Sequence, residues 1–324
     1  MKKLIKFLFC TIICLFLSLG SVACTEAKDT LNIYMPDGAP ALAMSKLMHE
    51  NIDFGFDTKY TVVASSNIAN YIIQKKADIA IIPINAASKI LNDGQDYKIV
   101  SAVTNGNLYI VGNRNISNLS DLKGEVVGVI GQGNVPDLNL KYLLNSDEVP
   151  YVQSETQVDS KVALRYFADA SNLIPMLKQG AINFGLLPEP AVSKLLSIAS
   201  NFNIELDIQA LWEGGSYPQA VLVVKNELCS NANFINELIS EMEENESWVI
   251  DNTSKAVEAV TDHLEEGVVT SIQNISSEAI TNCNIKVSVT TENDEIDRMK
   301  SYLEKIRSVN PMAIGNYTDN LFYN

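Results

Sequence analysis

The sequence predicts an α/β fold with mostly parallel sheets, divided into two lobes. Short segments rich in β-branched and aromatic residues alternate with segments whose apolar residues recur at helical spacing, an alternation typical of βαβ units. The chain has 324 residues, which exceeds the size that one hydrophobic core usually serves. We therefore expect two α/β lobes, with additional helices in the C-terminal third.

The expected strands are short, and most end at Gly, Pro, Asn or Ser. They cover residues 31–35, 60–64, 79–82, 97–103, 108–111, 126–130, 163–167, 184–187 and 220–224. Helical spacing between strands predicts helices at 67–75, 86–91 and 171–179. In the C-terminal third, the apolar positions and intervening glutamates of residues 234–244 predict a helix with one solvated face, and two more helices are expected at 254–264 and 294–306.

The N-terminus has the organisation of an export signal. Three lysines precede an apolar run from residue 7 to 19, which is shorter than the roughly 20 apolar residues of a membrane span. Residues 21–24 resemble a bacterial lipobox, in which Cys24 becomes the N-terminal residue and carries a diacylglyceryl anchor with palmitate-type chains. Ser21 departs from that pattern, where leucine is usual. The alternative is ordinary cleavage after Ala23 with an unmodified cysteine.

We accordingly expect residues 1–23 to be a signal peptide and residues 24–30 a lipid-anchored tether. Removing the three signal lysines leaves 21 of the 24 basic residues against 39 acidic ones, a net charge of −18. This charge argues against nucleic acid and anionic lipid as partners.

Two cysteines remain beyond the signal and its cleavage point, Cys229 and Cys283. An exported domain allows a disulfide between them, but one pair at this spacing is not a disulfide framework. Cys283 is equally consistent with a buried thiol. The pairing stays open from sequence.

The turn after the first expected strand is nearly free of large side chains. Asp37 suits a helix N-cap, and Pro40 suits the first helical turn, where its missing N–H costs nothing. The amide N–H groups of Gly38, Ala39 and Ala41 would then be available to a ligand's acceptor atoms. A tight turn with nothing bound is the alternative.

Similar small, polar turns follow other expected strands. In open α/β sheets, ligands bind at the carboxyl ends of the strands, so we expect these turns to converge on one cleft. The turn at 131–134 is not a dinucleotide fingerprint, because it lacks the third glycine. The expected ligand-binding residues are Met35, Asp37, Gly38, Ala39, Ser65, Ser66, Pro83, Asn85, Thr104, Asn107, Gln132, Gly133, Asn134, Asp169 and Glu189.

The motifs of common catalytic and metal sites are missing. The sequence contains no CxxC, HExxH or GxSxG motif and no Walker loop. Both histidines, His49 and His263, fall in helical patterns away from the candidate turns. Asp37, Asp169 and Glu189 could in principle transfer protons, but each stands at a turn or helix start, where capping is the simpler role. The sequence predicts a binding protein and not an enzyme, with no cofactor and no metal.

Several short motifs occur in a fixed order along the chain. They are YMPDGAPA at 34–41, ADIA at 77–80 with Pro83 after it, GNLYIV at 106–111, LSDLKG at 119–124, LPEP at 187–190, YPQA at 217–220, and NP, IG and FY at 310–311, 314–315 and 322–323. In this order they resemble the substrate-binding proteins of ABC importers, of the nitrate/sulfonate/taurine and thiamine-precursor type. The resemblance covers essentially the whole mature chain.

This resemblance implies a periplasmic-binding-protein type II fold, a two-lobed "Venus flytrap" with two crossover strands. By analogy, residues 31–113 and 215–324 form one lobe and residues 114–214 the other. It also implies an extracytoplasmic lipoprotein that binds a small solute between its lobes, closes, and docks on an ABC permease served by a separate ATPase. The implied location is the outer face of a bacterial cell membrane, Gram-positive in type.

The ligand class stays open between a sulfonate- or nitrate-like anion and a pyrimidine-like vitamin precursor. Asp37 stands beside the expected site, and no arginine falls in a candidate turn, which favours a neutral or cationic ligand. Tyr34, Tyr109, Trp212 and Tyr217 could supply aromatic walls, although aromatic residues at strand ends more often belong to the core.

Other functions are weighed against transport. The same fold family includes a vitamin-pyrimidine synthase that consumes its own active-site histidine and has a cysteine-rich motif, and this chain has neither feature. A sensory or structural surface lipoprotein without a transport role is the main alternative.

Overall fold

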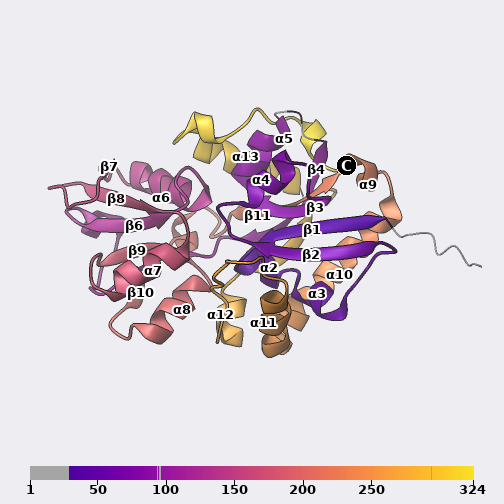
Figure 1. The fold of residues 1–324 in the computed structure, drawn as a ribbon. Coiled ribbons are helices and arrows are strands. Elements are labelled where there is room, and N and C mark those ends of the chain that lie inside the picture. The colour runs from indigo at the N-terminus through magenta and orange to yellow at the C-terminus, as the bar shows by residue number, and fades with distance from the viewer. Residues whose placement is uncertain (1–28, 93, 95, 293) are drawn as a thin grey trace, which may run out of the picture.

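The computed structural model describes residues 29–324 except 93, 95 and 293, so the expected signal peptide and Cys24 lie outside the described residues. The chain forms two α/β lobes side by side, each built on a six-stranded sheet within the described residues (Figure 1). The first lobe comprises residues 29–105 and 218–324, and the second comprises residues 108–211. Two junction segments, 106–107 and 212–217, join them. The predicted two-lobed α/β fold is confirmed.

The first sheet has the strand order β12-β4-β11-β3-β1-β2. Its strands are β1 (Thr30–Pro36), β2 (Asp57–Val63), β3 (Ile79–Pro83), β4 (Tyr97–Asn105), β11 (Pro218–Lys225) and β12 (Ile285–Val289). Strand β1 pairs in parallel with β2 and β3, whereas β11 runs antiparallel between β3 and β4. Strand β3 is almost continuously apolar because both of its faces are covered.

The second sheet has the order β10-β5-β9-β6-β8-β7. Its strands are β5 (Leu108–Gly112), β6 (Val126–Ile130), β7 (Tyr151–Gln153), β8 (Val162–Phe167), β9 (Phe184–Pro188) and β10 (Asn203–Asp207). Strand β6 pairs in parallel with β8 and β9, and β5 runs antiparallel to β9 and β10.

The position of β5 corrects the expected lobe boundary. A boundary after residue 113 assigns β5 to the first lobe, yet β5 pairs with β9 and β10 in the second sheet. The chain changes lobe at residues 106–107 instead. Only these two residues separate β4 from β5, so the two strands look like one continuous unit in sequence.

Helices cover both faces of each sheet (Figure 1). In the first lobe, α4 (Ile68–Ile73), α5 (Ile84–Asn92) and α13 (Glu295–Arg307) cover one face, and α2 (Ala39–Leu42), α3 (Ser45–Glu50), α10 (Ala232–Asp251) and α11 (Thr253–Asp262) cover the other. The helices α9 (Asn226–Cys229) and α12 (Ser277–Thr281) are short. In the second lobe, α6 (Val135–Ser146) lies opposite α7 (Ala170–Lys178) and α8 (Ala191–Ile198). The expected C-terminal helices correspond to α10, α11 and α13.

An aromatic cluster packs the junction between the lobes. The Trp212 ring stacks on Tyr142 of α6 at a centroid distance of 4.6 Å and lies 5.3 Å from Tyr302 of α13. Tyr302 stacks in turn on Tyr217, at 5.4 Å and an interplanar angle of 8°. Stacked rings of this kind add to the energy of apolar burial. Tyr142 belongs to the second lobe and Tyr302 to the first, whereas Trp212 and Tyr217 belong to the junction segment 212–217. The cluster therefore packs both lobes against this junction segment.

Candidate ligand-binding site between the lobes

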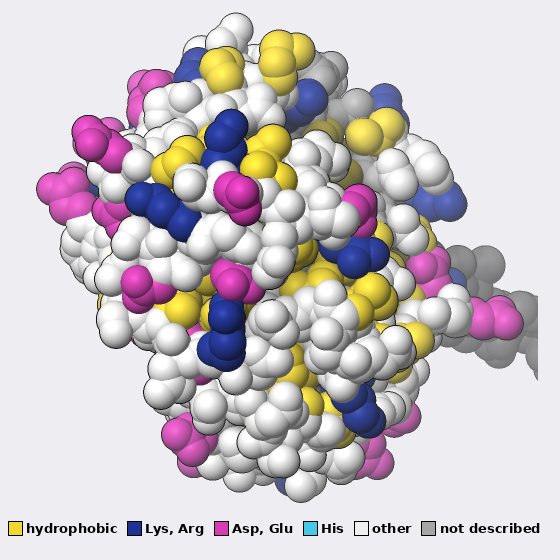
Figure 2. All heavy atoms as spheres, turned by 90° about the vertical axis from the view of Figure 1, so that its left-hand side faces the viewer, with side chains coloured by type: hydrophobic (Ala, Val, Ile, Leu, Met, Phe, Trp, Pro, Cys, Tyr) yellow, Lys and Arg dark blue, Asp and Glu magenta, His cyan; other side chains and the backbone are white. Residues whose placement is uncertain are grey.

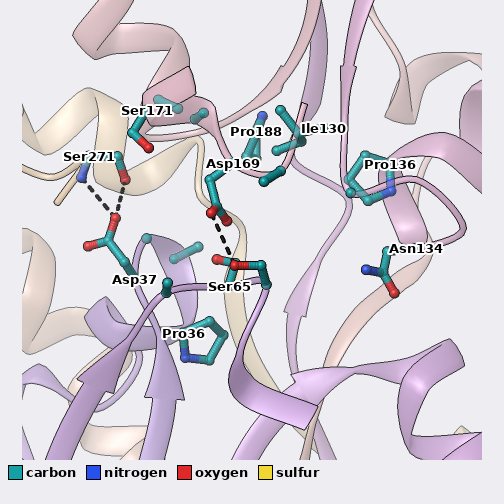
Figure 3. Close-up of a pocket in the computed structure, with 18 of the residues that line it drawn as sticks. Pro36, Asp37, Ser65, Ile130, Asn134, Pro136, Asp169, Ser171, Pro188 and Ser271 are labelled. Carbon is teal, nitrogen blue, oxygen red and sulfur yellow. Dashed lines mark hydrogen bonds between the residues drawn. The ribbon is translucent and has the colours of Figure 1, made fainter. Parts of the chain in front are cut away.

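A cavity of about 720 Å³ lies between the lobes, and both lobes supply its walls. Its lining includes the carboxyl ends of parallel strands, namely Pro36, Ala64 and Pro83 from the first lobe and Ile130, Phe167 and Pro188 from the second. Figure 3 shows Pro36 and Asp37 on one side of it and Ile130 and Pro188 on the other. Ligand pockets for small organic molecules measure about 300–1,000 Å³, so this interlobe cavity has a suitable size.

The structure brings most of the expected ligand-binding residues to this one cavity. Twelve of the fifteen line it: Asp37, Gly38, Ala39, Ser65, Ser66, Pro83, Thr104, Asn107, Gln132, Asn134, Asp169 and Glu189. They come from the turns after β1, β2, β6, β8 and β9, from the last residues of β3 and β4, and from the first junction segment.

Three expected residues are not part of the lining, which is a correction. Met35 is fully buried in the core of the first lobe, because its side chain alternates to the inner face of β1. Asn85 donates from Nδ2 to the Gly133 carbonyl oxygen at 3.2 Å, and the Gly133 N–H donates to the Asp137 carboxylate at 2.8 Å. Asn85 and Gly133 therefore connect the two lobes instead of facing a ligand.

The expected role of Asp37 as a helix cap is wrong. Gly38 is the N-cap of α2, with φ of 102°, a conformation that favours glycine, and no side chain caps this helix. The Asp37 carboxylate instead accepts hydrogen bonds from the Thr270 hydroxyl at 2.6 Å and from the N–H and hydroxyl of Ser271, both at 2.8 Å. The Ala41 N–H is also engaged, since it donates to the Gly38 carbonyl oxygen. Of the three N–H groups expected to be available, those of Gly38 and Ala39 come before the first N–H that donates within the helix, which is that of Ala41.

The segment that Asp37 anchors, residues 267–271, is a part of the cavity wall that sequence reasoning missed. It belongs to the connection between α11 and α12, which runs towards the second lobe (Figure 1). Val269 is 67% exposed, and the Thr270 carbonyl oxygen accepts from Lys194 Nζ of the second lobe at 2.6 Å. The segment thus contacts both lobes at the cavity.

Lys194 also supplies a cation that the sequence argument overlooked, because that argument considered only arginine. Among the described residues that line the cavity, Lys194 is the single lysine or arginine, and Asp37, Asp169 and Glu189 are the carboxylates. The lining therefore has more acidic than basic groups, and its lysine already donates to Thr270.

Asp169 faces the cavity. It precedes α7, but its side chain does not cap that helix. One of its carboxylate oxygens accepts from the Ser66 hydroxyl of the first lobe at 3.2 Å. Figure 3 shows the carboxylate pointing across towards the serines at the end of β2. This contact is one of the side-chain hydrogen bonds that cross between the lobes.

Glu189 has the capping role that the sequence favoured over proton transfer. Its side chain is buried, and its carboxylate accepts from the N–H and the hydroxyl of Ser193, both at 3.0 Å, in the first turn of α8. Burial raises the pKa of Glu189, while the hydrogen bonds from Ser193 oppose that rise.

Asn107 is fully buried in the first junction segment. Its Nδ2 donates to the carbonyl oxygens of Glu189 and Cys283, both at 3.3 Å, and its Oδ1 accepts from Gln219 Nε2 at 2.6 Å. The Glu189 N–H donates to the Asn107 carbonyl oxygen at 3.0 Å. This side chain has its hydrogen-bonding groups occupied by the protein, so its principal role is structural.

None of the four aromatic residues that the sequence offered as possible walls lines the cavity, in agreement with the alternative that they belong to the core. Tyr34 stacks on Tyr71 at 4.4 Å, whereas Trp212 and Tyr217 belong to the junction cluster. Tyr109 is buried within the second lobe. The aromatic residues that line the cavity are Tyr166 and Phe167, at the end of β8.

The remaining reactive groups lie elsewhere. Cys229 and Cys283 are both free thiols, which settles the question that the sequence left open. Within the described residues, no three His, Cys, Asp or Glu side chains are grouped so that they could hold a metal ion. In the same part of the chain, no helix has the length and apolar character needed to cross a bilayer.

No family model matches this sequence, and no curated protein matches it either. Solved structures do match. An ABC transporter protein from Parabacteroides distasonis is 20% identical with a TM-score of 0.74, over 91% of this chain and 99% of that one. SsuA, the periplasmic aliphatic sulphonate binding protein of Escherichia coli, is 12% identical with a TM-score of 0.67, over 91% and 97%.

The ligand-binding component of an ABC-type import system from Staphylococcus aureus, solved with zinc bound, is 12% identical with a TM-score of 0.63, over 92% of this chain and 97% of that one. The structural neighbours are thus substrate-binding proteins of ABC transporters, as the sequence resemblance predicted. At these identities the likeness establishes the two-lobed fold.

Proposed function

We propose that this chain is an extracytoplasmic substrate-binding lipoprotein of an ABC importer. It binds a small organic solute in the interlobe cavity and delivers it to a membrane permease, for which a separate ATPase supplies the energy. The observation that carries the proposal is the cavity of about 720 Å³, lined from both lobes by the ends of parallel strands. Solutes bind at this place in open α/β sheets, and a site shared by two lobes couples binding to their relative position.

Closure of the lobes supplies the mechanism. Within the described part of the chain, the side-chain hydrogen bonds that cross between the lobes include Ser66 to Asp169, Asn85 to Gly133, and Lys194 to Thr270. A solute that contacts both walls adds to these bonds only in the closed state, so it shifts the population towards that state. The closed form is then the one that the permease receives.

We also propose that the chain binds its solute without converting it chemically. Of the cavity carboxylates, Asp37 is engaged with Thr270 and Ser271, and Glu189 with Ser193. A general acid or base needs a group that is free to exchange a proton with substrate. The arrangement of these two carboxylates favours a binding protein over an enzyme.

We also propose that a lipid on Cys24 anchors the chain to the membrane. Strand β1 begins at Thr30, so a lipid on Cys24 would hold the first lobe close to the outer face of the cell membrane and raise its effective concentration at the permease. On the face drawn in Figure 2, basic side chains are scattered among acidic ones and form no basic patch within the described residues, which fits a protein without a nucleic-acid partner. A Cys24→Ala variant should move from the membrane fraction to the medium.

The proposal is tested by thermal unfolding of the purified full-length chain against a panel of small solutes, followed by uptake of the best one. A solute at about 100 times its Kd stabilises by about 2.7 kcal/mol, enough for a clear shift of the unfolding midpoint. Cells that lack the chain should lose uptake of that solute. Binding with unchanged uptake would support a sensory or structural lipoprotein, and stabilisation by no solute would contradict a binding function.

A further inference from the structure

Two buried side-chain oxygens in the lining of the cavity have no hydrogen-bond partner among the described residues. Thr104, at the end of β4, is fully buried, and its Oγ1 is unpaired. Gln219, at the start of β11, is half-buried, and its Oε1 is unpaired as well. Both residues line the interlobe cavity. Buried polar groups are almost always paired, and an unpaired one costs about 1–3 kcal/mol, so two together at a cavity point to a bound group that is missing from the protein alone.

Local strand geometry brings these two side chains together. In the β4–β11 ladder, Pro218 lies opposite Asn105 and Ala220 lies opposite Thr104. Gln219 is therefore the extra residue of a β-bulge beside Thr104. Bulges redirect a side chain and often occur next to functional sites. The two oxygens come from the neighbouring strands β4 and β11 inside the first sheet, at the end where β4 finishes and β11 begins, and we call this pair the floor subsite.

A chain of hydrogen bonds fixes which end of the Gln219 amide remains unpaired. Asn107 meets two backbone carbonyl oxygens, so the atom facing them must be its NH₂ group. Its other atom, Oδ1, must then accept, and the atom of Gln219 that faces it must be the Gln219 NH₂ group, at 2.6 Å. The group left over on Gln219 is its carbonyl oxygen, which can only accept a hydrogen bond.

From this we infer, resting on the proposed function, that the solute places an N–H or O–H donor group in the floor subsite. Gln219 Oε1 accepts from that group, and the Thr104 hydroxyl accepts a second donor hydrogen or donates to a neighbouring acceptor. Primary amines, amidines and primary carboxamides have this chemistry. Sulfonate and nitrate ions have only acceptors and cannot satisfy Gln219.

The charges around the cavity agree with this assignment. Its lining carries three carboxylates and one lysine, and that lysine already donates to the Thr270 carbonyl oxygen. Among the described residues, the Asp169 carboxylate accepts one hydrogen bond, from the Ser66 hydroxyl. A neutral or cationic donor group is therefore better matched to this lining than an oxyanion is.

Thr104→Val tests the floor subsite, because valine keeps the shape of threonine and removes only the hydroxyl. Ser101→Ala is a matched control: Ser101 lies on the same strand, is equally buried and has an unpaired Oγ, but does not line the cavity. Since neither hydroxyl is paired, both variants should keep or raise the unfolding midpoint of the free chain.

The experiment uses the full-length chain and two probe sets at equal concentration. One set holds methylammonium, benzamidinium, acetamide and benzamide, and the other holds methanesulfonate, benzenesulfonate, nitrate and sulfate. We expect the strongest stabilisation from the first set, and titration calorimetry should show about tenfold weaker binding of that probe to Thr104→Val, with no change for Ser101→Ala.

The outcomes separate the two proposals. Strongest binding in the second set, or unchanged affinity in Thr104→Val, would overturn the floor subsite and leave the binding function intact. Equal losses of affinity in Thr104→Val and Ser101→Ala would also overturn it, because the effect would then not depend on the cavity. Stabilisation by neither set would count against the proposed binding function itself, and the floor subsite with it.

Discussion

Two regions of the interlobe cavity are built in different ways: a floor, made by Asn107 with Thr104 and Gln219 of the floor subsite, and a mouth, made by the more exposed Ala168, Asp169 and Lys194. At the floor, Asn107 is fully buried and its side chain makes three hydrogen bonds within the protein. At the mouth, Asp169 and Lys194 are partly exposed, and each makes one side-chain hydrogen bond to the opposite lobe. The difference indicates that the floor holds the lobes in register, whereas the mouth can respond to a ligand.

The largest effect is expected at the floor. Asn107→Ala leaves two carbonyl oxygens and the Gln219 amide unpaired inside the junction, so we expect a loss of about 3–5 kcal/mol in the free energy of unfolding. Denaturant unfolding measures it. Asn134→Ala is the matched control, because Asn134 lines the cavity without capping α6 and should change stability by less than about 0.5 kcal/mol. Similar values for both variants would remove the distinction between floor and mouth.

A smaller effect is expected at Asp37, which anchors residues 267–271 of the cavity wall. Asp37→Ala removes the acceptor of three hydrogen bonds from Thr270 and Ser271, and we expect a loss of about 2 kcal/mol because water can replace part of them. Hydrogen exchange should show the Ser271 amide losing protection. Asp37→Asn keeps one acceptor oxygen and should lose about half as much. Unchanged exchange at Ser271 would contradict the anchoring role.

At the mouth, the expected effect is on ligand affinity and not on folding. Lys194→Met removes the hydrogen bond to the Thr270 carbonyl oxygen, which crosses between the lobes. The closed state should lose about 1 kcal/mol, so the affinity for a bound solute should fall about three- to tenfold. Lys178→Met, an exposed change in the last turn of α7, is the control for calorimetry. A drop in the stability of the free chain with no change in affinity would show that Lys194 only supports the fold.

The smallest effect is a pH dependence at Glu189. Burial raises its pKa above the ordinary value of 4.5 in the folded state, so folding favours the protonated form. The stability that this group contributes is present below pH 4.5 and is lost as the pH rises through the raised pKa. The unfolding free energy of the wild type should therefore fall relative to Glu189→Gln between pH 4 and pH 7. A constant difference over that range would contradict the raised pKa.

The sequence predicted the fold well because the strands of both sheets are apolar and end at turn residues. Every expected strand corresponds to an observed one, and those missed are short or weakly patterned, such as β7 (Tyr151–Gln153) and β10 (Asn203–Asp207). Such strands owe their structure to pairing with neighbours at the sheet edge, which local sequence does not encode.

From the sequence, the residues of the candidate site could be predicted only where they lie in turns that follow a strand. Turns such as Ser65-Ser66 follow a strand, so the rule about carboxyl ends found them. Residues 267–271 follow a helix and reach the cavity through Asp37, which is 234 positions from Ser271 in the chain. The burial of Asn107 could not be predicted from the sequence either, because the neighbouring residues do not distinguish an asparagine that joins two lobes from one that contacts a ligand.

The most direct test of the central claim is to identify a small molecule that co-purifies with the full-length chain and to ask where it binds. Ala168 is exposed at the mouth and lines the cavity, so Ala168→Trp should fill it, whereas the exposed Ala181 of the same lobe lies outside the lining. Mass spectrometry of the denatured proteins should find the solute with the wild type and Ala181→Trp and lose it with Ala168→Trp. Equal amounts of solute in all three proteins would show that the interlobe cavity is not the binding site.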